Sequence, residues 1–168
     1  MELYRKYFTS EQLEKLAEMQ PNWGVNVLTV GHYIHPANSN YPDANHPNSY
    51  FFDGKKGRVL KEYQLVYIAS GRGIFEADQV GKVEVESGTV FILFPDNWHN
   101  YQPLKEQGWE EYWVGFSGPY AEYLMKQDCF NPNTPLIHIG FNLEFLNIFI
   151  RLIDTLKYEG VAFSQIAS

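Results

Sequence analysis

Residues 62–117 carry the strongest structural signal in the chain, and they read EYQLVYIASGRGIFEADQVGKVEVESGTVFILFPDNWHNYQPLKEQGWEEYWVGFS. Runs of β-branched and aromatic residues alternate there with turn-forming residues. The pattern predicts a tight turn at 70–73 and strands at Tyr63–Ala69, Ile74–Ala77, Val80–Val85, Thr89–Phe94, Trp98–Gln102 and Trp109–Ser117. Short strands with turns about every eight to twelve residues, and no helices between them, are typical of an antiparallel barrel or sandwich.

Upstream of this region, the sequence predicts one helix and one strand. Thr9 and Gln12 have the spacing of a capping box, which begins a helix expected over residues 9–20. A strand is expected over Val25–Ile34, and the proline- and asparagine-rich residues 35–49 read as a long surface loop.

The hydrophobic period changes after Ser117. Pro119 suits the first position of a short helix over 120–127, and Asn142 can cap a helix over Leu143–Tyr158. The second helix is apolar around so much of its circumference that it needs cover from more than one side. We therefore expect a mostly-β barrel with a short N-terminal helix at residues 1–117 and a C-terminal helical appendage at 118–168. A further helix is expected to start within 161–168 and to be cut short.

Length and charge narrow the classes of function. The chain has 168 residues, with 13 Lys and Arg against 20 Asp and Glu, so its net charge is −7. This length predicts one compact domain, and the acidic balance argues against binding a phosphate backbone through a basic face. No apolar run is long enough for a signal peptide or a membrane helix, which predicts a cytoplasmic protein without membrane contact.

Cysteine and histidine usage argues against a metal centre. The single cysteine, Cys129, excludes a disulfide framework and a cysteine-based zinc site, and we interpret it as a small buried hydrophobe. His32 and His35 are three residues apart, which places them on opposite faces of a strand. His46 lies in the long loop, and no two histidines have the His-x-His spacing that presents two ligands on one face. We expect no metal and no cofactor.

His99 and Tyr101 follow the strand that ends at Pro95 and point to the same side. Neutral His and Tyr side chains offer donors and acceptors without a buried charge, as a site for a sugar or another small polar ligand requires. The alternative is that His99 is a hydrogen-bonded core residue at the rim of the barrel.

The strand Trp109–Ser117 alternates, so Trp109, Glu111 and Trp113 share one face. A carboxylate between two tryptophans is unusual in a dry core, because a buried charge needs a partner. Either this face meets solvent, or Glu111 meets a ligand or an arginine. Arg58 is a candidate cation, although it also reads as an exposed loop charge beside three lysines.

Together these motifs resemble the N-terminal effector-binding domain of AraC-type transcriptional regulators. The matching pieces are Tyr63-x-Leu65-x-Tyr67-Ile68-x-x-Gly71-x-Gly73, then Gly88, Phe94-Pro95-x-x-x-His99-x-Tyr101, Trp109, and Trp113-Val114-x-Phe116-x-Gly118. The resemblance is strong over about residues 58–125. It implies a cupin-like, jelly-roll β-barrel that binds a small effector, often a sugar, and a helical appendage that dimerises. DNA binding would belong to a C-terminal helix-turn-helix domain that this chain lacks.

The resemblance also maps effector contacts onto Tyr101, Trp113 and, by position, Glu111, where the arabinose-responsive member carries a histidine. An arginine contact falls on Arg58. With His99, these five residues are the predicted ligand site, and the predicted effector is a neutral mono- or disaccharide. The chain is thus expected to be the sensing, dimerising domain of a regulator and not an enzyme. The alternatives are a stand-alone cupin enzyme, such as a sugar isomerase or a metal-dependent dioxygenase, and a lectin-like module without a regulatory role.

Overall fold

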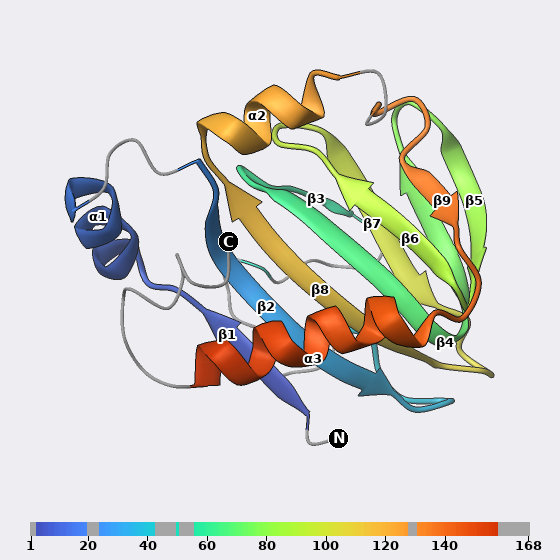
Figure 1. Cartoon of the computed structure of the whole chain (residues 1–168). Coiled ribbons are helices and arrows are strands. Elements are labelled where there is room, and N and C mark those ends of the chain that lie inside the picture. The colour runs from blue at the N-terminus through green and yellow to red at the C-terminus, as the bar shows by residue number, and fades with distance from the viewer. Residues whose placement is uncertain (1–2, 20–23, 43–49, 51–55, 128–130, 158–168) are drawn as a thin grey trace.

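The computed structural model describes residues 3–19, 24–42, 50, 56–127 and 131–157. Its elements follow one another as shown in Figure 1. They are β1 (Tyr4–Tyr7), α1 (Ser10–Met19), β2 (Asn26–His35), β3 (Arg58–Val59), β4 (Tyr63–Ala77), β5 (Gly81–Glu86), β6 (Thr89–Leu93), β7 (Trp98–Pro103), β8 (Trp109–Ser117), α2 (Pro119–Met125), β9 (Leu136–His138) and α3 (Leu143–Lys157).

The strands form two antiparallel layers that share β4. The first layer has the order β1-β2-β8-β4-β6-β9, and in the second layer β4 lies between β5 and β7, with β3 paired to β7. Every strand pair is antiparallel. The predicted fold class, a mostly-β antiparallel barrel with a C-terminal helical appendage, is confirmed.

β4 passes from one layer to the other, and here the predicted turn at 70–73 is wrong. The strand runs unbroken from Tyr63 to Ala77, with a register shift between Ile68 and Ser70. Gly71 has φ 88°, and a Cβ at this position would lie 2.2 Å from the carbonyl oxygen of Gly108. Glycine is required because the backbones approach so closely where β4 leaves β8.

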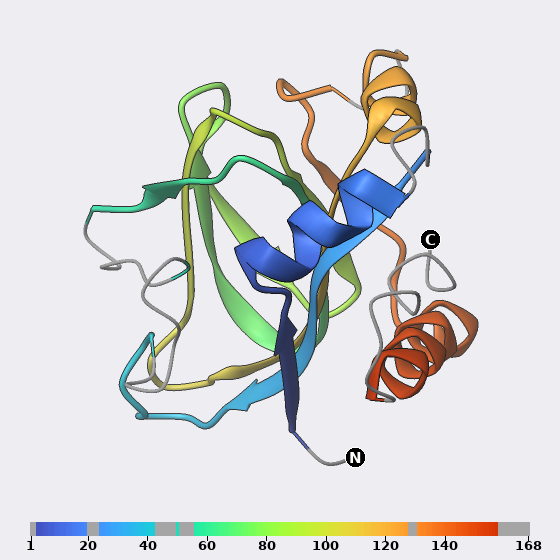
Figure 2. The same ribbon diagram turned by 90° about the vertical axis from the view of Figure 1, so that its left-hand side faces the viewer.

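Two hydrophobic clusters lie on opposite faces of the first layer. The inner cluster, between the layers, includes Val66, Phe91 and Trp109. The outer cluster joins Tyr67 and Tyr112 to residues of α3. Figure 2 shows α3 outside the barrel, alongside this layer, and Phe149, Ile153 and Leu156 are its buried residues. One face of α3 therefore completes the fold of the barrel.

Two predicted helix starts are confirmed, whereas three short strands were not predicted. The capping box at Thr9 and Gln12 is present, and the Oδ1 atom of Asn142 accepts a hydrogen bond from the Phe145 amide at the start of α3. The strands β1, β3 and β9 were not predicted, and β9, which pairs with β6, lies within residues 118–168, where only helices were expected. Cys129, His46 and the predicted helix within 161–168 lie outside the described residues.

Candidate functional site

A small polar cavity lies inside the barrel. Its lining comes from strands of both layers, β1 included, and from Tyr50 upstream of β3: Arg5, Tyr7, Tyr50, Arg58, Gln64, Tyr101, Glu111 and Trp113. Four of the five predicted site residues are in this set. The fifth, His99, does not line the cavity but accepts a hydrogen bond from Arg58, which does. The fold therefore brings together residues that lie more than fifty positions apart in the sequence.

Arg58 lies at the centre of the hydrogen-bond network of the cavity. Its Nη2 atom donates to the Tyr101 hydroxyl at 2.8 Å and to Gln64 Oε1 at 3.3 Å. Its Nη1 atom donates to the Tyr50 carbonyl oxygen, and its Nε atom donates to His99 Nε2 at 3.2 Å. The pairing of β3 with β7 places Arg58 opposite His99 and turns it inward. The reading of Arg58 as an exposed loop charge is therefore wrong.

His99 holds Arg58 in place as a neutral acceptor. Its side chain is 2% exposed. Burial, reinforced by the positive charge of Arg58, lowers the pKa of His99 to about 3. A neutral ring with Nε2 accepting from Arg58 carries its proton on Nδ1, which lies 3.1 Å from the Asn97 carbonyl oxygen. Both ring nitrogens are thus engaged within the protein.

Tyr101 presents a protonated phenol to the cavity. Burial raises its pKa to about 12, although Arg58 partly opposes this shift. The ring packs against Phe91 and Trp109 with centroid distances of 5.2 and 6.0 Å. The hydroxyl group is therefore held at a fixed position, where it can both donate and accept.

Glu111 is a buried carboxylate with two different oxygen atoms. The residue is 7% exposed, and Oε1 lies 3.2 Å from Nε2 of His35. Oε2 is buried and has no hydrogen-bond partner among the residues that the structure describes. Because a buried polar atom without a partner costs stability, such an atom in a cavity points to a ligand that donates to it.

Trp113 supplies an apolar wall. It lies opposite Gly31 in the register of β2 and β8, and a Cβ at Gly31 would come within 2.2 Å of the indole ring. Glycine thus makes the room into which the indole packs. Trp109 shares this face of β8 as predicted, but it is 2% exposed in the inner cluster and does not line the cavity. One tryptophan, not two, forms the wall.

A second buried acidic residue, Glu62, is hydrogen-bonded to Tyr50, which lines the cavity. Tyr50 donates to Glu62 Oε2 at 2.9 Å, and Thr29 donates to Oε1 at 3.3 Å. Burial raises the pKa of Glu62 despite these hydrogen bonds. Tyr50 also stacks at a tilt on Tyr7, with 4.7 Å between ring centroids. The free volume inside is about 10 Å³, roughly the minimum for one water molecule.

Sequence reasoning missed several lining residues, for different reasons. Gln64 shares a face with Val66 and Ile68 in a predicted strand, so alternation alone could have placed it inside. Arg5 and Tyr7 gave no such signal, because β1 has four residues and no apolar pattern. Among the described residues, no group of three or more His, Cys, Asp or Glu side chains is arranged to hold a metal ion. None of the helices in the described part of the chain is long and apolar enough to span a membrane.

Comparison with known proteins assigns this architecture to a family. The family model of the AraC-like ligand binding domain matches residues 37–165. The raffinose operon transcriptional regulatory protein of Pediococcus pentosaceus is 29% identical over 98 residues, which are 55% of this chain and 35% of that protein. The chain thus spans about a third of the length of this curated relative.

Solved structures with a related outline are more distant. The YhaK protein of Escherichia coli is 13% identical with a TM-score of 0.49, over 84% of this chain and 52% of that one. The Cnp3 cupin domain of Schizosaccharomyces pombe is 10% identical with a TM-score of 0.43, over 77% and 71%. Because the family model covers well over half of the chain, the protein belongs to the family of AraC-like ligand-binding domains.

Proposed function

We propose that this domain senses a small neutral carbohydrate inside its barrel and thereby controls a transcriptional regulator. The observation that carries the proposal is the cavity, where Glu111 Oε2 lacks a partner among the described residues. Hydroxyl groups of a sugar would donate to this oxygen and accept from Arg58 and Tyr101, while the apolar face of a sugar ring would stack on Trp113. The relative that regulates a raffinose operon supports a sugar as the effector.

Effector entry requires a rearrangement, because the cavity is far smaller than the roughly 300–1000 Å³ of ordinary ligand pockets. The strand β1 could transmit this rearrangement, because it contacts both the cavity and α3. Arg5 and Tyr7 line the cavity, whereas Tyr4 donates from its hydroxyl to the Leu156 carbonyl oxygen of α3 at 3.2 Å. An effector that favours one arrangement of β1 would therefore shift the population of states at α3.

We propose that the regulator is a homodimer and that α3 contributes to the contact between copies. One face of α3 packs against the barrel, but Leu143 and Ile148 on the helix are 58% and 62% exposed. Glu144 and Arg151 flank Ile148 on the exposed side. Two antiparallel copies related by a twofold axis at Ile148 would place each Glu144 beside the partner's Arg151, so the face complements itself in charge. Ile148→Lys should shift the sedimentation of a dimer to that of a monomer, whereas Ile34→Lys on β2 should not.

In this proposal DNA is bound by a separate helix-turn-helix domain, the protein works in the cytoplasm without membrane contact, and it catalyses no reaction. Stoichiometric iron, manganese or zinc after purification without a chelator would contradict the last point and favour a cupin enzyme.

Calorimetric titration with raffinose, melibiose, sucrose and galactose tests the sugar proposal. We expect saturable binding of at least one of them, and we expect Tyr101→Phe to weaken it. Tyr112→Phe is the matched control, because Tyr112 lies on the opposite face of β8 and donates to Glu110. Tight binding of a carboxylated sugar instead of these neutral ones would contradict the role given to Glu111.

A further inference from the structure

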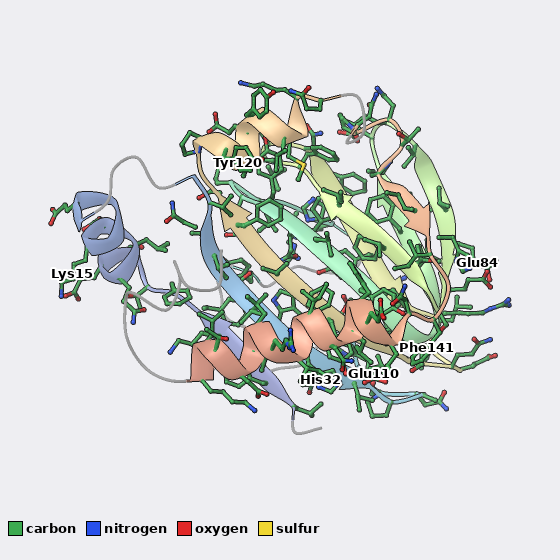
Figure 3. All side chains as sticks on the ribbon, viewed as in Figure 1. Lys15, His32, Glu84, Glu110, Tyr120 and Phe141 are labelled. Carbon is green, nitrogen blue, oxygen red and sulfur yellow. The ribbon has the colours of Figure 1, made fainter. Side chains whose placement is uncertain are left out.

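Two buried histidines, each paired with a carboxylate of β8, join β2 to β8 from opposite faces. Inside the barrel, His35 Nε2 lies 3.2 Å from Glu111 Oε1. Outside it, His32 Nε2 lies 2.8 Å from Glu110 Oε1, and Figure 3 shows His32 and Glu110 side by side close to α3. The two histidines are equally buried, at 3% and 1% exposure. The pairs therefore have the same chemistry in different surroundings.

Those surroundings leave the two carboxylates unequal. Oε1 of Glu110 also accepts from the Tyr112 hydroxyl at 3.0 Å, and the Glu110 side chain is 28% exposed. The Glu111 side chain is 9% exposed, and its Oε2 has no partner among the described residues. The outer carboxylate is thus satisfied by protein and solvent, whereas the inner one keeps an unused acceptor at the cavity.

We propose that His35 is a positioning residue for the effector site, and this inference rests on the proposed function. Because a carboxylate oxygen only accepts, the His35 ring carries its proton on Nε2 and donates it to Oε1. The ring is held between Tyr33 and Tyr41, at centroid distances of 4.6 and 4.8 Å. His35 thereby fixes the carboxylate so that Oε2 faces the cavity, where it accepts from the effector.

This geometry also defines the group that is recognised. A fixed carboxylate oxygen selects a hydrogen-bond donor and repels a carboxylate or a phosphate. An ammonium group is disfavoured in turn, because the guanidinium of Arg58 lines the same cavity. The recognised group is therefore a neutral hydrogen-bond donor, which in the proposed sugar is a hydroxyl, and an analogue without that hydroxyl leaves Glu111 Oε2 unsatisfied.

Three substitutions test the role of His35 with melibiose as the titrated sugar. His35→Phe keeps a ring between the two tyrosines but removes the donor, and we expect it to weaken binding about tenfold. His35→Gln restores an N–H donor and should recover most of the affinity. His32→Phe is the matched control, because it breaks the outer pair without touching the cavity, and it should leave the affinity unchanged.

Failure of the positioning role and failure of the sugar proposal would give different results. Unchanged binding by His35→Phe, or equal losses in His35→Phe and His32→Phe, would overturn the positioning role while leaving the sugar proposal intact. If melibiose does not bind, the same comparison is made with whichever of raffinose, sucrose and galactose binds, and absence of binding of all four sugars by the unsubstituted protein would instead count against the sugar proposal. In that case long-range ¹H–¹⁵N spectra of the histidine rings still test the positioning role. We expect a proton on Nε2 of His35 that is lost from the spectrum in Glu111→Ala, and a proton on Nδ1 instead would overturn it.

Discussion

The two faces of the first layer of the barrel use the same strands for different purposes. Along β8, Glu111 and Trp113 face inward and Tyr112 faces outward. The outer face is covered by apolar side chains of α3, whereas the inner face borders a small cavity that is lined by Glu111 and by Arg58 of the second layer. Both faces pack apolar clusters, but among the described residues only the inner one also holds polar groups that can bind, and such groups commonly cost some stability.

The largest expected effect is on the outer face. Phe149 is 3% exposed and packs on the rings of Tyr67 and Tyr112, at centroid distances of 6.5 and 5.8 Å. Phe149→Ala removes a buried ring, so we expect the free energy of unfolding to fall by about 3–5 kcal/mol in urea titrations. The melibiose affinity of the folded protein should not change. A parallel loss of affinity would show that the two faces are not separable.

On the inner face we expect a smaller loss of stability, but here together with a loss of affinity. Gly31→Ala places a Cβ against the indole of Trp113, so we expect a loss of about 1–3 kcal/mol in stability together with a marked loss of melibiose affinity. The double variant Gly31→Ala/Trp113→Phe relieves the clash with a smaller ring. It should regain stability but not affinity, and recovery of both would contradict the role of Trp113 as the apolar wall.

Acid should act on the inner face through His99. The pKa of this ring is about 6.5 in an unfolded chain and about 3 in the folded protein. The unfolded state therefore binds a proton first as the pH falls, and stability is lost between about pH 6.5 and pH 3. The contribution lost by pH 5 is about 2 kcal/mol. Urea titrations of His99→Gln should lack this part of the acid sensitivity, and an identical pH profile in the variant would contradict the assignment.

The inward face of β8 could be predicted from the sequence in part. Alternation along residues 109–117 placed Trp109, Glu111 and Trp113 on one face, because a strand buried on both sides still keeps its period of two. It could not tell which tryptophan reaches the cavity. That depends on Gly31, a residue of another strand that makes room for Trp113.

Features that depend on pairing between distant strands escaped prediction. Gly71 and Gly73 read as a turn, yet here glycine allows β4 to cross between layers. Arg58 could not be told from an exposed charge, because its direction is set by the pairing with His99. Arg5 lies on β1, a strand of four residues whose sequence has no apolar period, so its place in the site could not be predicted.

The most direct test of the sugar site is a titration of the ¹⁵N-labelled protein with melibiose, followed through the indole Nε1–H signals. Trp113 lines the cavity, whereas Trp98 lies outside it and donates from Nε1 to the Lys56 carbonyl oxygen at 2.8 Å. We predict a saturable shift of the Trp113 signal with the Trp98 signal unchanged. A shift of Trp98 without Trp113, or no shift of either signal with melibiose and, in repeat titrations, with raffinose, sucrose and galactose, would contradict a carbohydrate site in the barrel.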